Sequence, residues 1–282
     1  MHKKIIWISS YPKSGNTLVR SLLTSYYFSK DGNLDFKLLK NITQFPTNTL
    51  LNDLGFKVKN NKENLKNYIK AQKLLSKKGS TRFLKTHSSL FEIDNIPFTD
   101  LDCSLGVIYI VRDPRNVVSS FASHFQLSLK EASNRMINAH HIGTKFEASG
   151  IQYTGSWSFN FNSWKSFEIQ NRYLLIKYEN LINDTEEILL VILNFINKLN
   201  NNNTRINKKK LSNSVKSCSF EEMKKKEALE GFHESTTDKK TGKKINFFRL
   251  GKKNNYKYSL DLNIRKELES SFKKEMEELG YL

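Results

Sequence analysis

Cysteine is scarce in this sequence, since Cys103 and Cys218 are the only two among 282 residues. They lie far apart and have neither the close spacing of a cysteine metal cluster nor the paired set of a disulfide framework. A small fold held together by disulfides is therefore excluded. The sparse use of cysteine fits a reducing compartment, and we expect a cytoplasmic protein.

Long hydrophobic runs are missing as well. No stretch approaches the roughly 18 uninterrupted apolar residues that a membrane-spanning helix needs, so we expect no transmembrane segment. The apolar run at residues 5–9 is short and leads into a Pro-Lys-Ser-Gly turn without a small-residue cleavage site, unlike a signal peptide. The length and the 38% of hydrophobic residues suffice for one large α/β domain, which we expect to span residues 1–282.

Acidic residues are few compared with basic ones: 28 Asp and Glu face 46 Lys and Arg, a net charge of +18. Much of the surplus lies in residues 198–257, which hold 17 Lys and Arg against 6 Asp and Glu. A general bias toward Lys and Asn explains part of it, and attraction of a polyanion is the functional alternative. The segment has no ordered basic and aromatic stripe and no zinc-finger spacing, so we expect no specific nucleic-acid recognition.

Short apolar runs alternate with segments of helical periodicity along the chain. The runs that predict strands are 5–9, 82–85, 106–111 and 173–177, and the helical segments are 18–27, 115–125, 129–140, 157–169, 185–199 and 262–279. This alternation predicts a parallel sheet with helices on both faces. The polar residues 200–210 are expected to form an exposed loop, and residues 225–260 a mobile flap over a cofactor or an acceptor.

A tight loop after the first strand has the composition of an anion site. In residues 11–17, Tyr-Pro-Lys-Ser-Gly-Asn-Thr, Gly15 lets the backbone approach a ligand. The hydroxyl groups of Ser14 and Thr17 and the first amides of the following helix would point at the anion, and Lys13 adds a positive charge. The loop is not a Walker A motif, because its lysine precedes the glycine. Taken alone, the segment also fits an ordinary strand-to-helix turn.

A second candidate anion site follows the run at 106–111. Arg112 stands at the carboxyl end of that strand, where open α/β sheets bind ligands, and a guanidinium suits bidentate contact with a phosphate. If a helix begins near Pro114, Ser120 lies within its first two turns and faces the same anion. The alternative is an ion pair of Arg112 with Asp113 or another acid.

Together these segments resemble the two phosphate sites of the sulfotransferases that use 3′-phosphoadenosine-5′-phosphosulfate (PAPS), the cytosolic type and its bacterial relatives. The family's 5′-phosphosulfate loop reads close to Tyr-Pro-Lys-Ser-Gly-Thr-Thr-Trp, which residues 11–18 match apart from Asn16 and Leu18. The arginine and the serine of its 3′-phosphate site match Arg112 and Ser120. The resemblance implies a P-loop-like three-layer α/β/α fold around a central parallel sheet, with PAPS as the sulfuryl donor and no metal.

Weaker matches follow in the family's order along the chain. Residues 85–87 resemble its Lys-Thr-His segment, 155–157 its Gly-Ser-Trp helix start, 178–180 its Tyr-Glu-Asp segment, 219–223 its Ser-Phe-x-x-Met segment, and 248–251 its Arg-Lys-Gly flap. The similarity thus extends over nearly the whole chain. The first loop and the Arg112 element are highly specific as a pair, whereas the later matches are individually weak.

The resemblance assigns a role to each matched residue. His87 would be the general base that takes a proton from the acceptor, while Lys13 and Lys85 would stabilise charge on the transferring group. The implied cofactor contacts are Lys13, Ser14, Gly15, Asn16 and Thr17 at the 5′-phosphate, Arg112, Ser120, Arg249 and Gly251 at the 3′-phosphate, and Tyr178 and Phe220 at the adenine.

Two departures from the family pattern keep alternatives open. Leu18 replaces a tryptophan that stacks on the adenine in many relatives, and Leu250 replaces the lysine of Arg-Lys-Gly, for which Lys252 or Lys253 would substitute. A member that only binds the desulfated product PAP therefore stays open. So do a small-molecule kinase, against which the misplaced lysine and the absence of a metal-holding acidic pair count, and a basic polyanion-binding protein without catalysis.

The acceptor, a hydroxyl or an amine on a small molecule or glycan, is expected to be selected by the variable segments 33–62, 130–154 and 225–247. His124, His140 and His141 belong to helical patterns, where they are structural or line this acceptor pocket. Four aromatic residues are expected to pack into the core rather than bind a ligand: Tyr26, Tyr27, Trp157 and Trp164.

Overall fold

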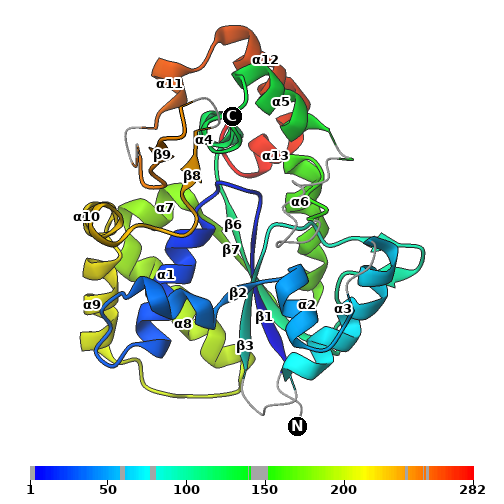
Figure 1. Cartoon of the computed structure of the whole chain (residues 1–282), viewed down its shortest axis with the longest axis vertical. Helices are drawn as coiled ribbons and strands as arrows, with labels where there is room; N and C mark the ends of the chain where they lie inside the picture. The colour runs from blue at the N-terminus through cyan, green and yellow to red at the C-terminus, as the bar shows by residue number, and fades with distance from the viewer. Residues whose placement is uncertain are drawn as a thin grey trace.

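The computed structural model describes residues 4–57, 61–76, 81–138, 140, 152–238, 241–249, 251 and 254–282. The described residues form a five-stranded sheet in the order β2-β3-β1-β6-β7, with parallel pairing throughout and helices on both faces (Figure 1). Its strands are β1 (Ile5–Ser10), β2 (Thr43–Gln44), β3 (Arg82–Thr86), β6 (Ser104–Val111) and β7 (Tyr173–Lys177). All four predicted strands are confirmed, and the short edge strand β2 is an addition.

The sheet is buried because its residues alternate between two hydrophobic clusters. Ile5 and Trp7 of the central strand face one cluster, whereas Ile6 and Ile8 face the other, and all four side chains are fully buried. The first cluster is covered by α3 (Asn61–Ser76), α4 (Pro114–Phe125), α5 (Leu129–Ile137), α6 (Trp157–Trp164), α12 (Leu262–Ser271) and α13 (Lys273–Glu278). The second is covered by η1 (Phe36–Asn41), α1 (Asn16–Phe28), α8 (Thr185–Leu199), α9 (Lys208–Ser217) and α10 (Phe220–Glu230).

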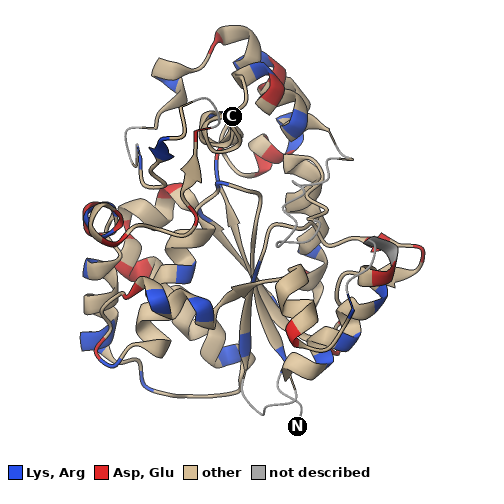
Figure 2. Ribbon diagram, viewed as in Figure 1, with Lys and Arg blue, Asp and Glu red and all other residues tan. Residues whose placement is uncertain are grey.

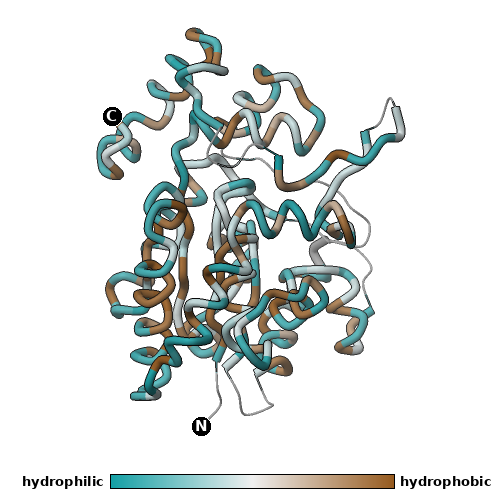
Figure 3. The backbone as a smooth tube through the Cα atoms, turned by 90° about the vertical axis from the view of Figure 1, so that its left-hand side faces the viewer, coloured by the Kyte–Doolittle hydropathy of each residue, from teal (hydrophilic) through white to brown (hydrophobic). Residues whose placement is uncertain are grey.

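The remaining elements lie around this three-layer body. They are α2 (Asn48–Asp53), the hairpin β4 (Glu92–Ile93) and β5 (Ile96–Pro97), η2 (Lys165–Gln170), α7 (Tyr178–Asn183), the hairpin β8 (Thr236–Thr237) and β9 (Lys244–Ile245), and α11 (Tyr256–Ser259). Figure 3 shows the resulting hydropathy pattern, with hydrophobic residues gathered in the sheet and on the inner sides of the helices.

Several predicted boundaries differ from the structure. The helix expected over 129–140 ends at Ile137, the one over 157–169 continues after Trp164 as the 3₁₀ helix η2, and the one over 262–279 is divided into α12 and α13 at the buried Phe272. The expected loop at 200–210 gives way to α9 at Lys208. The predicted flap over 225–260 begins inside α10 and contains the β8–β9 hairpin and α11.

The tryptophans and tyrosines behave differently from one another. Trp157 and Trp164 are 1% and 0% exposed, which confirms that they pack inward. Tyr26 is partly buried and packs against the second cluster, whereas Tyr27 is 37% exposed, so the expectation of core packing is met in part by Tyr26 and was wrong for Tyr27. Tyr27 stands on the last turn of α1, and its ring centre lies 5.4 Å from that of Phe83 on β3.

The surplus of basic residues lies mainly on the outside of the molecule. Figure 2 shows Lys and Arg spread over the outer helices, among them α9 and α10. On these two helices Lys208, Lys209, Lys216, Lys224 and Lys225 are exposed. Among the described residues, no helix combines the length and the apolar character that crossing a bilayer requires.

Candidate active site

The candidate residues emerge together at the carboxyl edge of the sheet. Ser9 of β1 is in register with Thr86 of β3 and Tyr109 of β6. Because the strands are parallel, the loops that follow β1, β3, β6 and β7 open on the same side, as ligand sites of open α/β sheets do. These loops line one cavity of about 1470 Å³, which is larger than a typical pocket for one drug-sized ligand.

The two predicted anion sites meet in this cavity. The Nη1 of Arg112 donates a hydrogen bond to the backbone carbonyl of Lys13 at 3.2 Å, and its guanidinium lies 4.3 Å from the ring centre of Tyr178. The Tyr178 ring in turn rests on Gly15, where an added Cβ would come within 2.5 Å of the ring. Gly15 also has a φ of +105°, which favours glycine. The first loop, Arg112 and Tyr178 therefore form one continuous wall.

Arg112 does not form the ion pair with Asp113 that was the alternative. The carboxylate of Asp113 instead accepts from Nη2 of Arg115 at 2.7 Å, and Arg115 also binds Glu269. In the described part of the chain, the buried Nε of Arg112 and the buried Oγ of Ser14 have no hydrogen-bond partner. An unsatisfied buried donor costs about 1–3 kcal/mol, so a bound anion at these donors would stabilise the site. The residues thus fit a phosphate-bearing ligand.

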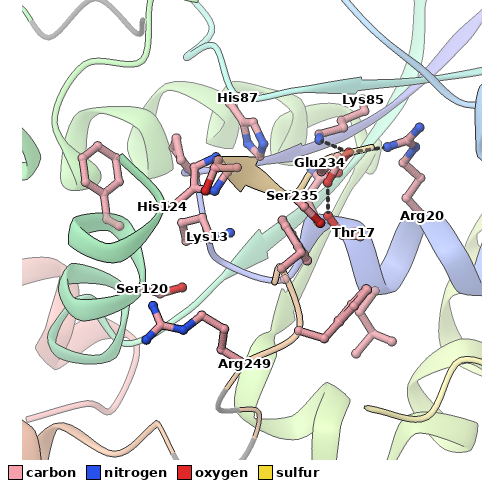
Figure 4. Close-up of a pocket in the computed structure, with 18 of the residues that line it drawn as sticks. Lys13, Thr17, Arg20, Lys85, His87, Ser120, His124, Glu234, Ser235 and Arg249 are labelled. Atoms are coloured by element: carbon pink, nitrogen blue, oxygen red, sulfur yellow. Dashed lines mark hydrogen bonds and ion pairs between the residues drawn. The ribbon is translucent and has the colours of Figure 1, made fainter. Parts of the chain in front are cut away.

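Arg249 approaches from the predicted flap and lies close to Ser120 on α4 (Figure 4). Its Nη1 donates a hydrogen bond to the hydroxyl of Ser123, which lies three residues after Ser120 on the same face of α4. The part of the flap next to Arg249 is held on α10 by Glu227, whose carboxylate accepts from the amides of Phe247 and Phe248 at 2.7 and 2.9 Å. Glu227 is 3% exposed, so this clamp is well shielded from water.

The residues that the resemblance assigns to the adenine also lie in the cavity wall. Phe220, at the start of α10, lies so close to Gly251 that an added Cβ there would come within 2.9 Å of the ring. Gly251 has a φ of +53°, which allows the backbone to turn beside the ring. Phe220, Gly251, Tyr178 and Leu18 all line the same cavity.

His87 stands directly after β3 with a defined tautomer. Its Nδ1 lies 2.9 Å from the backbone carbonyl of Ser10, which can only accept, so Nδ1 carries the proton and Nε2 is left as an acceptor. Burial, together with the charge of nearby Lys85, lowers the pKa of His87 to about 3. The imidazole is therefore neutral at physiological pH and able to take a proton.

Lys13 is a second perturbed group. Burial lowers its pKa to about 7, with Glu234 opposing the shift and the cations Lys85 and Arg112 reinforcing it. Its ammonium lies 3.9 Å from the ring centre of Phe247, so the flap covers it. A lysine with this pKa is only partly charged near neutral pH, and an anionic ligand would restore its charge.

Lys85 has a partner that sequence reasoning missed. Its Nζ is 2.9 Å from Oε1 of Glu234, and the same oxygen lies 2.6 Å from Nη1 of Arg20, while Oε2 accepts from the Thr17 hydroxyl at 2.8 Å (Figure 4). Arg20 lies one turn after Thr17 on α1, a spacing that indicates a shared face. Nothing in the local sequence of Glu234 indicates its position, since it is 149 residues from Lys85.

Helix α6 supports the strand ends from behind. The indole Nε1 of Trp157 donates to the Arg112 carbonyl at 3.2 Å, and that of Trp164 donates to the Ser88 carbonyl at 3.1 Å. Between them Asn160 donates from Nδ2 to the His87 carbonyl at 3.0 Å. The spacing of these residues along the helix gives one face, and the Gly-Ser-Trp start predicted from sequence is thus part of the scaffold of the site.

The structure brings the predicted site residues together. Those lining the cavity are Lys13, Gly15, Asn16, Thr17, Lys85, His87, Arg112, Ser120, Tyr178, Phe220, Arg249 and Gly251. Ser14 is fully buried directly beneath this lining. His124 lines the cavity as well, whereas His140 is exposed. His141, Leu250, Lys252 and Lys253 lie outside the described residues.

The chain is similar to known proteins along nearly its whole length. A family model described as "Sulfotransferase domain" matches residues 3–280. Sulfotransferase 1E1 of Homo sapiens is 24% identical over 272 residues, covering 96% of this chain and 83% of that protein. Luciferin sulfotransferase of Photinus pyralis is 24% identical over 266 residues, covering 89% and 66%.

The fold comparison gives the same result. The crystal structure of mouse sulfotransferase SULT7A1 complexed with PAP superimposes with a TM-score of 0.60 at 18% identity, covering 97% of this chain and 84% of that one. The predicted fold class and enzyme class are confirmed by these matches. With its phosphate-directed loop, its strand-terminal arginine and a family model that spans nearly its whole length, the chain belongs to the sulfotransferase family.

Proposed function

We propose that this site transfers the sulfuryl group of PAPS to a hydroxyl or an amine of a small acceptor and releases PAP. One observation supports this above the others: Arg112 hydrogen-bonds the backbone of the Lys13 loop while stacking on Tyr178, so two anion sites and an aromatic platform share one cavity. A nucleotide with a phosphate at each end of its ribose matches that layout. Neither a small-molecule kinase nor a generic polyanion-binding protein requires two anion sites and an aromatic platform in one cavity.

In this proposal the loop and the strand ends divide the binding work. Ser14, Gly15, Asn16 and Thr17 hold the 5′-phosphate through the Ser14 hydroxyl and the backbone amides at the start of α1. Arg112, Ser120 and Arg249 hold the 3′-phosphate. Phe220 and Tyr178 contact the adenine, and Gly251 allows the flap to pass beside Phe220.

Three side chains act on the transfer itself. Nε2 of His87 takes the proton of the acceptor, and the Nδ1 hydrogen bond to Ser10 holds the ring in the orientation that this requires. Lys13 and Lys85 stabilise the negative charge on the departing phosphate oxygen and on the sulfuryl oxygens. The low pKa of His87 in the ligand-free protein rises when the negative charges of PAPS are nearby, which makes it a stronger base.

The acceptor binds on the side of the cavity next to His87. The wall there comes from the variable segments expected to select the acceptor, namely Gln44, Thr47, Leu50, Gln152 and Thr154. Its mixture of apolar and amide groups suits a small organic alcohol or amine with few charges. The chain works in the cytoplasm in this proposal, with Cys103 and Cys218 as buried free thiols.

Residues 225–260 act as a flap within a single 1–282 domain. Glu227 holds the chain at Phe247 and Phe248, and the next residue, Arg249, reaches α4. Opening of this segment would expose both Lys13 and the 3′-phosphate site, since Phe247 covers Lys13 and Arg249 is part of the 3′-phosphate site.

The proposal is tested by comparing the binding of PAP and of AMP, which lacks the 3′-phosphate. The wild-type protein is expected to bind PAP at least about 100-fold more tightly than AMP, and Arg112→Met to reduce that ratio toward one. Arg205→Gln removes an exposed arginine outside the cavity and serves as the matched control. An unchanged ratio in Arg112→Met would refute the assignment of the 3′-phosphate site.

The role of His87 is tested by turnover with labelled PAPS and an acceptor found by screening. His87→Ala is expected to lower kcat by about 10²–10⁴-fold while PAP affinity changes little, because a general base acts on the acceptor's proton. Full turnover in the purified variant would show that another group takes the proton.

A further inference from the structure

Glu234 is an acidic residue of the cavity wall that the proposed mechanism does not use. It lies between α10 and the β8–β9 hairpin, with 16% of its side chain exposed. Its two carboxylate oxygens bind three groups from two other elements: Lys85 at the end of β3, and Arg20 and Thr17 on α1. A carboxylate engaged in this way is fixed in both position and orientation.

Glu234 favours the charged form of Lys85. It is 5% exposed, and burial lowers its pKa, while Glu234 raises it and Arg20 lowers it. The ionisable groups that face this cluster are Glu234 and His233 from the segment after α10, Arg20 from α1, Lys13 from the first loop, His87 after β3 and His124 from α4. Glu234 is the carboxylate of this set, and the other members are cations or neutral imidazoles.

We infer that Glu234 is a positioning residue for sulfuryl transfer: its carboxylate keeps the Lys85 ammonium protonated and turned into the cavity, and Arg20 fixes the carboxylate in place. Arg20 suits the second task because its Nη2 is anchored on the Leu39 carbonyl at 2.9 Å. The carboxylate itself stays negatively charged, since its pKa is well below the usual range: burial opposes this shift, but the charges of Lys85 and Arg20 outweigh it.

The arrangement also links the flap to the catalytic lysine. Glu234 lies on the segment that leads to Arg249, so one stretch of chain supplies both the proposed 3′-phosphate contact and the partner of Lys85. The lysine is therefore set in place when this stretch is seated against α1. This inference rests on the proposed role of Lys85.

The first test measures the titration of Lys85 directly in the ligand-free protein. Trace labelling with acetic anhydride across pH, followed by peptide mass spectrometry, reports when each lysine loses its proton. In Glu234→Gln the midpoint of Lys85 is expected to fall by at least about one pH unit, because a neighbouring negative charge is lost. In Arg20→Gln it is expected to rise, because a neighbouring positive charge is lost. A general loosening of the site would not shift the midpoint in opposite directions.

Glu230→Gln is the matched control, since Glu230 is exposed and pairs with Lys226 on the surface of α10. The control is expected to leave the Lys85 midpoint and the activity unchanged. A Lys85 midpoint that is the same in wild type and Glu234→Gln would overturn the inference.

The second test is the pH profile of turnover. Relative to the wild type, Glu234→Gln is expected to lose kcat by about tenfold or more at the alkaline end of the profile and to recover as the pH falls, because Lys85 loses its proton at a lower pH. The KM for PAPS is expected to change less than threefold. An equal loss of kcat at every pH would mean a merely structural role. Tighter PAP binding with unchanged kcat would mean that the Glu234 carboxylate only competes with PAPS for the site. Each of these two results would overturn the inference.

The roles of Lys85 and of Glu234 can be refuted separately. If Lys85→Met kept full turnover, the proposed role of Lys85 in transfer would be wrong, although the labelling result would still establish the link between Glu234 and Lys85. If Lys85→Met were inactive but the labelling midpoint did not respond to Glu234→Gln, only the role of Glu234 would be refuted.

Discussion

Lys13 loses its proton more easily than an ordinary lysine, and this makes ligand binding sensitive to pH. Its pKa is about 7 in the ligand-free protein because it is buried beside Lys85 and Arg112. A bound 5′-phosphate favours the charged form and raises the pKa, so PAP binding takes up a proton above pH 7. We expect the affinity for PAP to fall by roughly tenfold per pH unit between pH 7.5 and 9, the slope for one proton.

Isothermal titration calorimetry measures both the slope and the proton. The heat of binding is compared in two buffers of different ionisation enthalpy, neither of which is a phosphate or a sulfonate that would compete for the site. At pH 8.5 the wild type is expected to take up nearly one proton per PAP. Lys13→Met is expected to bind more weakly but with a nearly flat pH dependence. If its slope equalled that of the wild type, another group such as Lys85 would carry the proton and the reasoning about Lys13 would be refuted.

Two further predictions concern the walls of the site. Gly15→Ala is expected to weaken PAP binding about 10- to 100-fold and to destabilise the protein by about 1–3 kcal/mol, because residue 15 has a positive φ and an added Cβ would clash with Tyr178. Binding assays and thermal unfolding measure the two effects, and an unchanged affinity for PAP would contradict the contact. Glu227→Gln places a side-chain amide opposite the backbone amides of Phe247 and Phe248, so it is expected to cost about 1–3 kcal/mol of stability. It is also expected to lower the ratio of the affinities for PAP and AMP. An unchanged ratio would show that Glu227 does not position Arg249.

Much of the site was predictable because its features are local in the sequence. Three features each indicate the carboxyl end of a strand in a parallel sheet. They are the glycine turn after β1, the arginine directly after β6 and the Lys-Thr-His segment at the end of β3. Parallel strands then bring their carboxyl ends to one edge, which is why Lys13, His87 and Arg112 line one cavity. Helix α10 was missed because it is mostly polar and its periodicity is weak.

By itself, the sequence determined the order of the four longest strands, the candidate anion-binding loop and the identity of the residues at the strand ends, because backbone propensity and hydrophobic periodicity act between near neighbours. Only the tertiary structure decided how these groups are charged and held. Glu234 meets Lys85 across 149 residues, and Glu227 holds the flap through backbone amides that any residue could supply. Such contacts depend on how distant segments pack, and packing leaves no repeated pattern in the sequence of either partner.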